Sequence, residues 1–159
     1  MLKILLAEDN KVDEIALTEY LRNNLGEFTI SCVPTCKALI TELESEETYD
    51  IVILDHILED EQSLKYISKI KEKSKSAEII VLSGQSDISV CIQYLNSGVY
   101  AYLNKEHNAF QNLVKNIKEI ITKTTGQESF FKANQLFIYI GLIVALLIVA
   151  LYYFFKSAN

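Results

Sequence analysis

Short apolar segments alternate with segments of helical periodicity over the first 124 residues, and this alternation restricts the fold more than any other feature of the chain. The expected strands are residues 3–7, 28–33, 51–54, 79–82 and 100–103. The expected helices follow them at about 11–25, 35–43, 64–70, 87–96 and 108–123. Residues 51–54 form a continuous β-branched and leucine run, which is typical of a central parallel strand covered on both faces. The pattern predicts an α/β fold with a doubly wound, five-stranded parallel sheet.

Polar side chains stand at the carboxyl end of four of the expected strands. Glu8 and Asp9 follow the first strand, Asp55 the third, Ser83 the fourth and Lys105 the fifth. In doubly wound sheets functional groups gather beyond this edge. Three carboxylates there would repel one another without a cation, and carboxylate oxygens suit Mg²⁺. An ammonium and a hydroxyl can both bind phosphoryl oxygens, so the set predicts phosphoryl transfer to a carboxylate.

Four segments with this spacing resemble the receiver domain of response regulators, the CheY-like family, over residues 1 to about 124. The matching segments are residues 4–10, 50–55, 81–84 and 100–105. The resemblance implies a flavodoxin-like fold with strand order 2-1-3-4-5. It also implies two-component signal transduction, in which a histidine kinase or a histidine phosphotransfer protein donates the phosphoryl group. Such a domain is a phosphoacceptor switch that assists its own phosphorylation and dephosphorylation rather than an enzyme.

The resemblance also assigns roles at the predicted site. Asp55 is the implied phosphoacceptor. The implied Mg²⁺ ligands are Asp9, Asp55 and the backbone carbonyl of Ile57, and Glu8 holds a metal-bound water.

Three further residues have implied roles in the phosphorylated state. Ser83 and Lys105 contact the phosphoryl group, and Tyr102 is the aromatic residue that rotates inward when Ser83 is drawn toward that group. Ser83 and Tyr102 are therefore the implied switch pair.

The chain departs from the family pattern at several positions. Glu59 and Glu106 stand where the family often has proline, and a proline after Lys105 would bend the chain through a cis peptide bond. Without proline a cis bond costs about 2.5–4 kcal/mol, so Lys105–Glu106 is either trans or strained. The side chain of His56 is expected to point away from that of the acceptor. Ile57 is apolar and flanks the phosphoryl position, so we expect it to hinder an attacking water and slow self-dephosphorylation.

Composition excludes several other classes. The formal net charge is −6, and the densest basic stretch, 65–75, is interrupted by Glu72, so nucleic-acid binding is not expected. Three cysteines and two histidines do not suggest a disulfide framework or a zinc site. Cys32 and Cys91 lie in apolar segments and are expected to be small core residues. The first residues lead directly into a strand, so no signal peptide is expected.

The segment 136–155 holds twenty residues without a charge, Asn, Gln or Pro. A helix of this length spans roughly 30 Å, the thickness of the hydrocarbon core of a bilayer. We expect a transmembrane helix at 136–155, a linker at 125–135 and the receiver domain at 1–124. The chain would then be a single-pass protein of the inner (cytoplasmic) membrane with its receiver domain in the cytoplasm. Its partners would be the lipid bilayer and either a membrane protein or a second copy of itself.

Two alternative functions remain open at this point. One is a phosphorylation-independent, membrane-anchored adaptor that uses the receiver fold as a scaffold; it predicts that Asp55→Asn has little effect on partner binding. The other is a phosphatase of the haloacid-dehalogenase type, which also uses an aspartyl nucleophile at a strand end. That family requires a second aspartate two residues later, where this chain has Ile57.

Overall fold

A computed structural model of the chain describes residues 1–45, 47–59, 61–106, 108–126 and 140. The chain consists of two units, Met1–Lys118 and Glu119–Asn159. The first unit holds the α/β fold that the alternating pattern predicts. In the second unit, residues 119–126 are helical and so is Ile140. The hydroxyls of Thr124 and Thr125 donate to backbone carbonyls one turn earlier, at 3.0 Å each.

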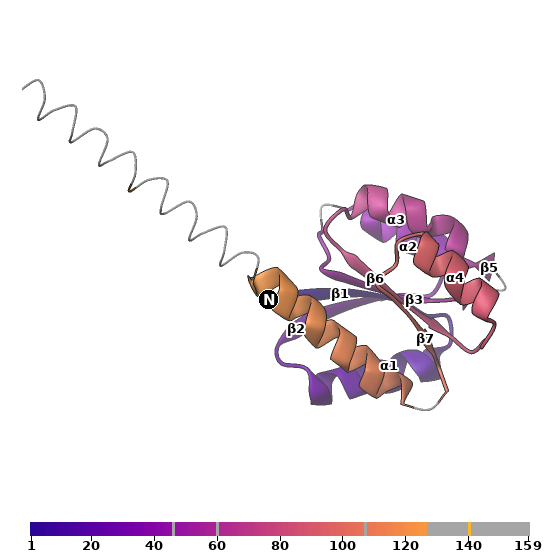
Figure 1. Cartoon of the computed structure of the whole chain (residues 1–159), viewed down its shortest axis with the longest axis horizontal. Helices are drawn as coiled ribbons and strands as arrows, with labels where there is room; N and C mark the ends of the chain where they lie inside the picture. Colours follow the sequence, from indigo (N-terminus) through magenta and orange to yellow (C-terminus); the bar gives the residue numbers. More distant parts are fainter. Residues whose placement is uncertain (46, 60, 107, 127–139, 141–159) are drawn as a thin grey trace, which may run out of the picture. The chain divides into compact units, whose positions relative to one another are not determined.

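The first unit is built on a five-stranded parallel sheet (Figure 1). Its strands are β1 (Leu2–Ala7), β2 (Phe28–Val33), β3 (Ile51–Asp55), β6 (Glu78–Ser83) and β7 (Ala101–Asn104). They are arranged in the order β2-β1-β3-β6-β7, which confirms the predicted order 2-1-3-4-5. Strand β3 lies in the centre and all five of its residues are buried, as its continuous apolar sequence predicts.

Helices cover both faces of this sheet. They are α1 (Lys11–Asn24), α2 (Cys36–Leu43), α3 (Ile67–Lys73), α4 (Ile88–Asn96) and the helical residues 109–118. Figure 1 shows α2, α3 and α4 on one face, and α1 with residues 109–118 on the other. The side chains of Asn10, Thr35 and Asp87 accept backbone N–H groups at the starts of α1, α2 and α4. These caps satisfy donors that have no partner within the helix.

The core follows the two-residue period of the strands. Leu5, Val52 and Val81 pack in one cluster with side chains of α2, α3 and α4. Their neighbours in sequence point to the opposite face, because successive side chains of a strand alternate. Both sets are fully buried, so each face of the sheet is covered. This rigid support fixes the strand ends at which the predicted site residues stand.

The connection after Asp55 differs from the loop that the sequence predicts. It forms a small antiparallel pair, β4 (Ile57–Leu58) with β5 (Glu61–Gln62). A 3₁₀ turn, η1 (Ser63–Tyr66), then leads into α3, so the third α-helix begins later than expected. Leu58 is fully buried in the cluster beneath α2 and α3, and this burial favours the extended backbone of β4.

The expectation that Cys32 and Cys91 are core residues was wrong. Cys32 is exposed because β2 is an edge strand, and Cys91 is only half-buried on α4. Cys36, at the start of α2, is the buried cysteine.

The predicted transmembrane segment 136–155 lies outside the described residues, apart from Ile140. Within the part of the chain that the structure describes, no helix has both the length and the apolar character needed to cross a bilayer.

Candidate functional site

The predicted site residues meet at the carboxyl edge of the sheet. Glu8 and Asp9 follow β1, Asp55 ends β3 and Ser83 ends β6. The first of these acids, Glu8, is 3% exposed, and Asp55 is 9% exposed, whereas Asp9 lies at the surface. One carboxylate oxygen from each of Glu8, Asp9 and Asp55 can be chosen so that all lie within 4.8 Å of one another. The structure therefore brings together the three acids that the strand ends predict.

Lys105 points into this carboxylate cluster. Its Nζ atom lies 2.7 Å from Oδ2 of Asp55 and 2.8 Å from Oε2 of Glu8. Burial lowers the pKa of Lys105, but hydrogen bonds to Asp55 and Glu8 outweigh it and raise the pKa above its ordinary value. Burial raises the pKa of Glu8, with the nearby charge of Asp55 acting in the same direction. The ammonium is thus retained as the counter-charge of two buried carboxylates.

The backbone around Lys105 reaches this position without a cis peptide bond. The described part of the chain contains no cis bond, so Lys105–Glu106 is trans. The N–H of Lys105 donates to the carbonyl of Ser83 at 2.6 Å and continues the pairing of β7 with β6. Sequence reasoning missed one contact here: Oδ2 of Asp13, in the first turn of α1, lies 3.3 Å from Lys105 Nζ.

A backbone contact connects Asp9 to the segment after the acceptor. The N–H of Glu59 donates to Oδ2 of Asp9 at 2.9 Å. Glu59 has a φ of 49°, in the left-handed region that residues other than glycine rarely adopt. The contact holds the connection after β3 against the acidic cluster.

We expect proline, the family's frequent residue at position 59, to destabilise this protein. Proline fixes φ near −65° and has no N–H, so Glu59→Pro removes both the observed backbone conformation and the bond to Asp9. The free energy of unfolding should fall by about 2 kcal/mol. Denaturant unfolding of the full chain measures it, with Glu59→Gly as the control that keeps the N–H and relaxes φ. A proline variant as stable as the wild type would contradict the assignment of this conformation.

Ser83 lies at the cluster but its hydroxyl has local partners. It is fully buried, and its Oγ accepts the N–H of Gln85 at 3.0 Å. Tyr102, on β7, is half-buried, with its hydroxyl inside the protein. Its ring packs against that of Tyr94 on α4, with centroids 5.3 Å apart. The implied switch pair thus stands on the neighbouring strands β6 and β7, as the resemblance requires.

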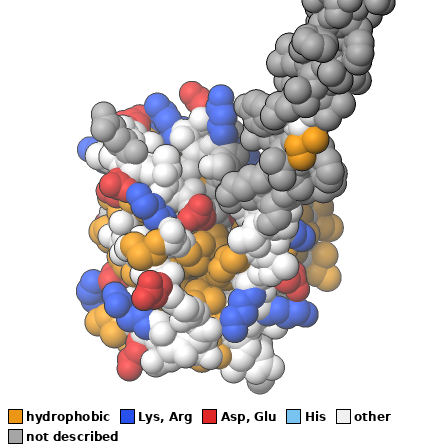
Figure 2. All heavy atoms as spheres, turned by 90° about the vertical axis from the view of Figure 1, so that its left-hand side faces the viewer, with side chains coloured by type: hydrophobic (Ala, Val, Ile, Leu, Met, Phe, Trp, Pro, Cys, Tyr) orange, Lys and Arg blue, Asp and Glu red, His pale blue; other side chains and the backbone are white. Residues whose placement is uncertain are grey.

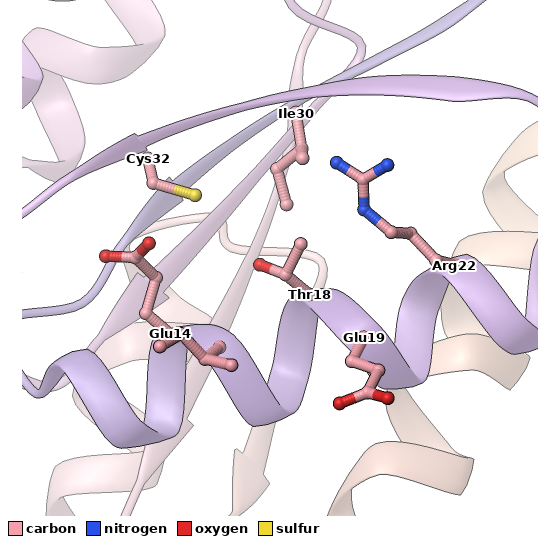
Figure 3. A pocket seen from close by; sticks show the side chains of 7 residues that line it. Glu14, Thr18, Glu19, Arg22, Ile30 and Cys32 are labelled. Atoms are coloured by element: carbon pink, nitrogen blue, oxygen red, sulfur yellow. The ribbon is translucent and has the colours of Figure 1, made fainter.

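A separate groove runs between α1 and the edge strand β2 (Figure 3). Glu14, Thr18 and Arg22 of α1 face Ile30 and Cys32 of β2 across it. The groove is open to solvent and has a volume of about 380 Å³. It shares no residue with the carboxylate cluster and does not contribute to that site.

The comparison with known families decides the identity of the chain. A model of the response regulator receiver domain matches residues 4–129. The chain belongs to this family. No curated protein gives a significant match.

Solved structures share the receiver fold. A CheY-like receiver domain protein from Methanospirillum hungatei is 19% identical, with a TM-score of 0.70 over 80% of this chain and 98% of that one. A two-component response regulator from Clostridium difficile is 23% identical, with a TM-score of 0.70 over 78% and 98%. A response regulator from Burkholderia pseudomallei, 19% identical with a TM-score of 0.61 over 75% and 72%, contains a phosphorylated aspartic acid and a calcium ion.

The residue after the acceptor joins a buried polar network in this receiver domain. His56 is 1% exposed, and its Nδ1 atom lies 2.9 Å from the hydroxyl of Tyr94. Burial lowers the pKa of His56 and favours the neutral imidazole. The hydroxyl of Ser63 lies 2.9 Å from that of Tyr94 and donates to the carbonyl of His56 at 3.2 Å. His56 is thus engaged with α4 in the interior, and sequence reasoning gave no indication of Tyr94 or Ser63 as its partners.

Proposed function

We propose that the chain is a phosphorylation switch in which Asp55 accepts a phosphoryl group from the phosphohistidine of a histidine kinase or histidine phosphotransfer protein. The observation that carries this proposal is the contact of the Lys105 ammonium with Asp55 and Glu8 in the carboxylate cluster. A buried carboxylate at a strand end, with a fixed cation beside it, is suited to accept a phosphoryl group. Membership of the receiver family supports the same function.

The donor set fits Mg²⁺. Glu8, Asp9 and Asp55 carry three negative charges, and Lys105 supplies one positive charge, which leaves the deficit that a divalent cation balances. Oxygen ligands are those that Mg²⁺ prefers, and it keeps several waters of its own. Asp9, Asp55 and the carbonyl of Ile57 would hold the ion, with Glu8 binding one of its waters. Once bound, the ion would neutralise charge on the phosphoryl oxygens.

In the proposed transfer, a carboxylate oxygen of Asp55 attacks the phosphorus of the phosphohistidine. The phosphorus–nitrogen bond breaks, and the imidazole nitrogen leaves with the electron pair. Lys105 then donates to a phosphoryl oxygen in place of Oδ2 of Asp55. The hydroxyl of Ser83 gives up its contact with Gln85 and donates to another phosphoryl oxygen.

The same movement would carry the signal to a partner. When Ser83 is drawn toward the phosphoryl group, Tyr102 turns inward and its contact with Tyr94 of α4 changes. The surface formed by α4 and β7, together with the helix that follows, would then present a different shape to a membrane protein or to a second copy of the chain.

A membrane tether is the second part of the proposal, and it rests on sequence. Residues 136–155 are long and apolar enough for a single span, with 125–135 as the linker and the receiver domain in the cytoplasm. The full chain should therefore co-sediment with lipid vesicles. Leu146→Lys in the middle of the segment should weaken this binding, and equal recovery of both proteins in the soluble fraction would refute the tether.

The first test is mass spectrometry of the full chain incubated with acetyl phosphate and Mg²⁺. We expect a single phosphoryl adduct that is absent from Asp55→Asn. Asp50→Asn, at the opposite end of β3, is the matched control and should keep the adduct. Failure of the wild type to form an adduct would favour the phosphorylation-independent scaffold, in which Asp55→Asn leaves partner binding unchanged.

The phosphorylated form should be long-lived. Ile57 is half-buried beside Asp55, and an apolar side chain there gives an attacking water no hydrogen-bond partner. We expect the adduct to persist for minutes in Mg²⁺ buffer, and Ile57→Asn to shorten its lifetime severalfold. A time course of the adduct mass after removal of acetyl phosphate measures both, and a wild-type lifetime of seconds would refute the expectation.

A further inference from the structure

Tyr94 is the one fully buried side chain of helix α4, and Val90 packs against the core only as a partly buried residue. Of its nine residues, Ile88–Asn96, only Tyr94 is buried, at 0% exposure. Three apolar side chains of the same helix face solvent: Ile88 at 75%, Ile92 at 51% and Leu95 at 46%. On a different face, the one at the left of Figure 1, hydrophobic side chains also lie exposed among charged ones (Figure 2). Because so little of α4 is buried, the contacts of Tyr94 have a large share in holding it.

The hydroxyl of Tyr94 is bound to the segment that follows the acceptor. It lies 2.9 Å from His56 Nδ1 and 2.9 Å from Ser63 Oγ. His56 and Ser63 are 1% and 0% exposed, so these bonds lie away from water. Hydrogen bonds in such surroundings are strong, and losing one leaves costly unpaired groups.

This segment begins directly after Asp55. His56 follows it directly, and the N–H of His56 donates to the carbonyl of Leu82 at 2.8 Å. A second bond, from the N–H of Ser63 to the carbonyl of His56 at 3.0 Å, closes the connection on itself. A change in the backbone at Asp55 therefore reaches the hydroxyl of Tyr94 through a single residue.

We propose that Tyr94 is a positioning residue that fastens α4 to the segment after Asp55 and transmits the state of Asp55 to α4 through His56. This route is distinct from that through Ser83 and Tyr102, although the ring of Tyr102 packs against both Tyr94 and His56. The transmission part rests on the proposed function, whereas the attachment of α4 does not.

Amide hydrogen exchange of the full chain tests both parts. In the unmodified protein, Tyr94→Phe keeps the ring but removes the hydroxyl, so exchange across 88–96 should rise by about tenfold. Acetyl phosphate treatment should change the exchange of α4 in the wild type. In Tyr94→Phe this change should be at most half as large, when mass spectrometry shows that both proteins are phosphorylated to the same extent. Ser63→Ala removes one hydrogen-bond partner of the Tyr94 hydroxyl, so it should have the same effects to a smaller extent. It replaces Tyr94→Phe in the test if that variant does not fold.

Tyr49→Phe is the matched control. Tyr49 is 4% exposed, and its hydroxyl also has two partners, Ser31 at 3.1 Å and the carboxylate of Glu42. Its loss should leave α4 exchange unchanged. The attachment is refuted if Tyr94→Phe exchanges like the wild type, or if Tyr49→Phe loosens α4 equally. The transmission is refuted if Tyr94→Phe keeps the full change in α4 exchange on phosphorylation. It is also refuted if the wild type takes no phosphoryl group, and this result would overturn the proposed function as well. In that case the exchange of the unmodified proteins still decides whether Tyr94 attaches α4.

Discussion

Lys105→Met should slow phosphorylation of Asp55 by about a hundredfold, the usual effect of removing one group that stabilises charge in a transition state. The Lys105 ammonium is already 2.7 Å from the acceptor oxygen, so it can follow the developing charge to the phosphoryl oxygens with little movement. Methionine fills a similar volume without the charge. The rate is measured from the growth of the phosphoryl adduct of the full chain in acetyl phosphate, by mass spectrometry.

Two precautions separate this effect from loss of structure. Without Lys105, the buried carboxylates of Glu8 and Asp55 lack their counter-charge, so the rates are compared at saturating Mg²⁺. Lys65→Met removes an exposed lysine that pairs only with Glu61 among the ion pairs of the described residues, and it should leave the rate unchanged. A rate for Lys105→Met within threefold of the wild type would show that the lysine is not part of the transfer.

The site was predictable because it depends on strand ends. In a parallel sheet, all carboxyl ends meet at one edge, so residues that follow the strands converge without knowledge of any side-chain conformation. Glu8, Asp9 and Asp55 confirm this. The backbone at Lys105 departs from the family pattern, because the proline that often follows this lysine is replaced by Glu106. The hydrogen bond between the Lys105 N–H and the Ser83 carbonyl extends the strand pairing and brings the lysine to the site with a trans bond.

The parts that sequence could not supply are contacts between distant segments. Tyr94 occupies an ordinary apolar position of a helix, and only the packing of α4 shows that its hydroxyl meets His56 and Ser63. Asp13 is an acid in the first turn of α1, where acids are common. The sequence therefore contains nothing that indicates its contact with Lys105. Cys32 was wrongly predicted to be a core residue, because the amino-acid composition of β2 does not show whether the strand lies at the edge or in the centre of the sheet.

Mg²⁺ should stabilise the protein by about 2.7 kcal/mol at a concentration one hundred times its dissociation constant, since it binds the folded state alone. The reason is the negative charge that Glu8, Asp9 and Asp55 retain beyond the single positive charge of Lys105, and their oxygens converge only after β1 and β3 pair. Denaturant unfolding of the full chain across a Mg²⁺ titration measures the gain. Burial raises the pKa of Glu8, so protons compete with the ion at a higher pH than for an exposed carboxylate, and the gain should shrink as the pH falls toward that raised pKa.

Asp9→Asn separates ion binding from general charge effects. Asp9 is the exposed member of the cluster, so its replacement perturbs the core little while removing one anionic ligand. Its amide oxygen can still accept the N–H of Glu59, which preserves the connection after β3. We expect most of the Mg²⁺-dependent gain to disappear in Asp9→Asn and to remain in Asp50→Asn, which lowers the net negative charge equally at the other end of the sheet. Equal gains in both variants would mean that Mg²⁺ only screens the overall negative charge, and the acidic cluster would then not be a metal site.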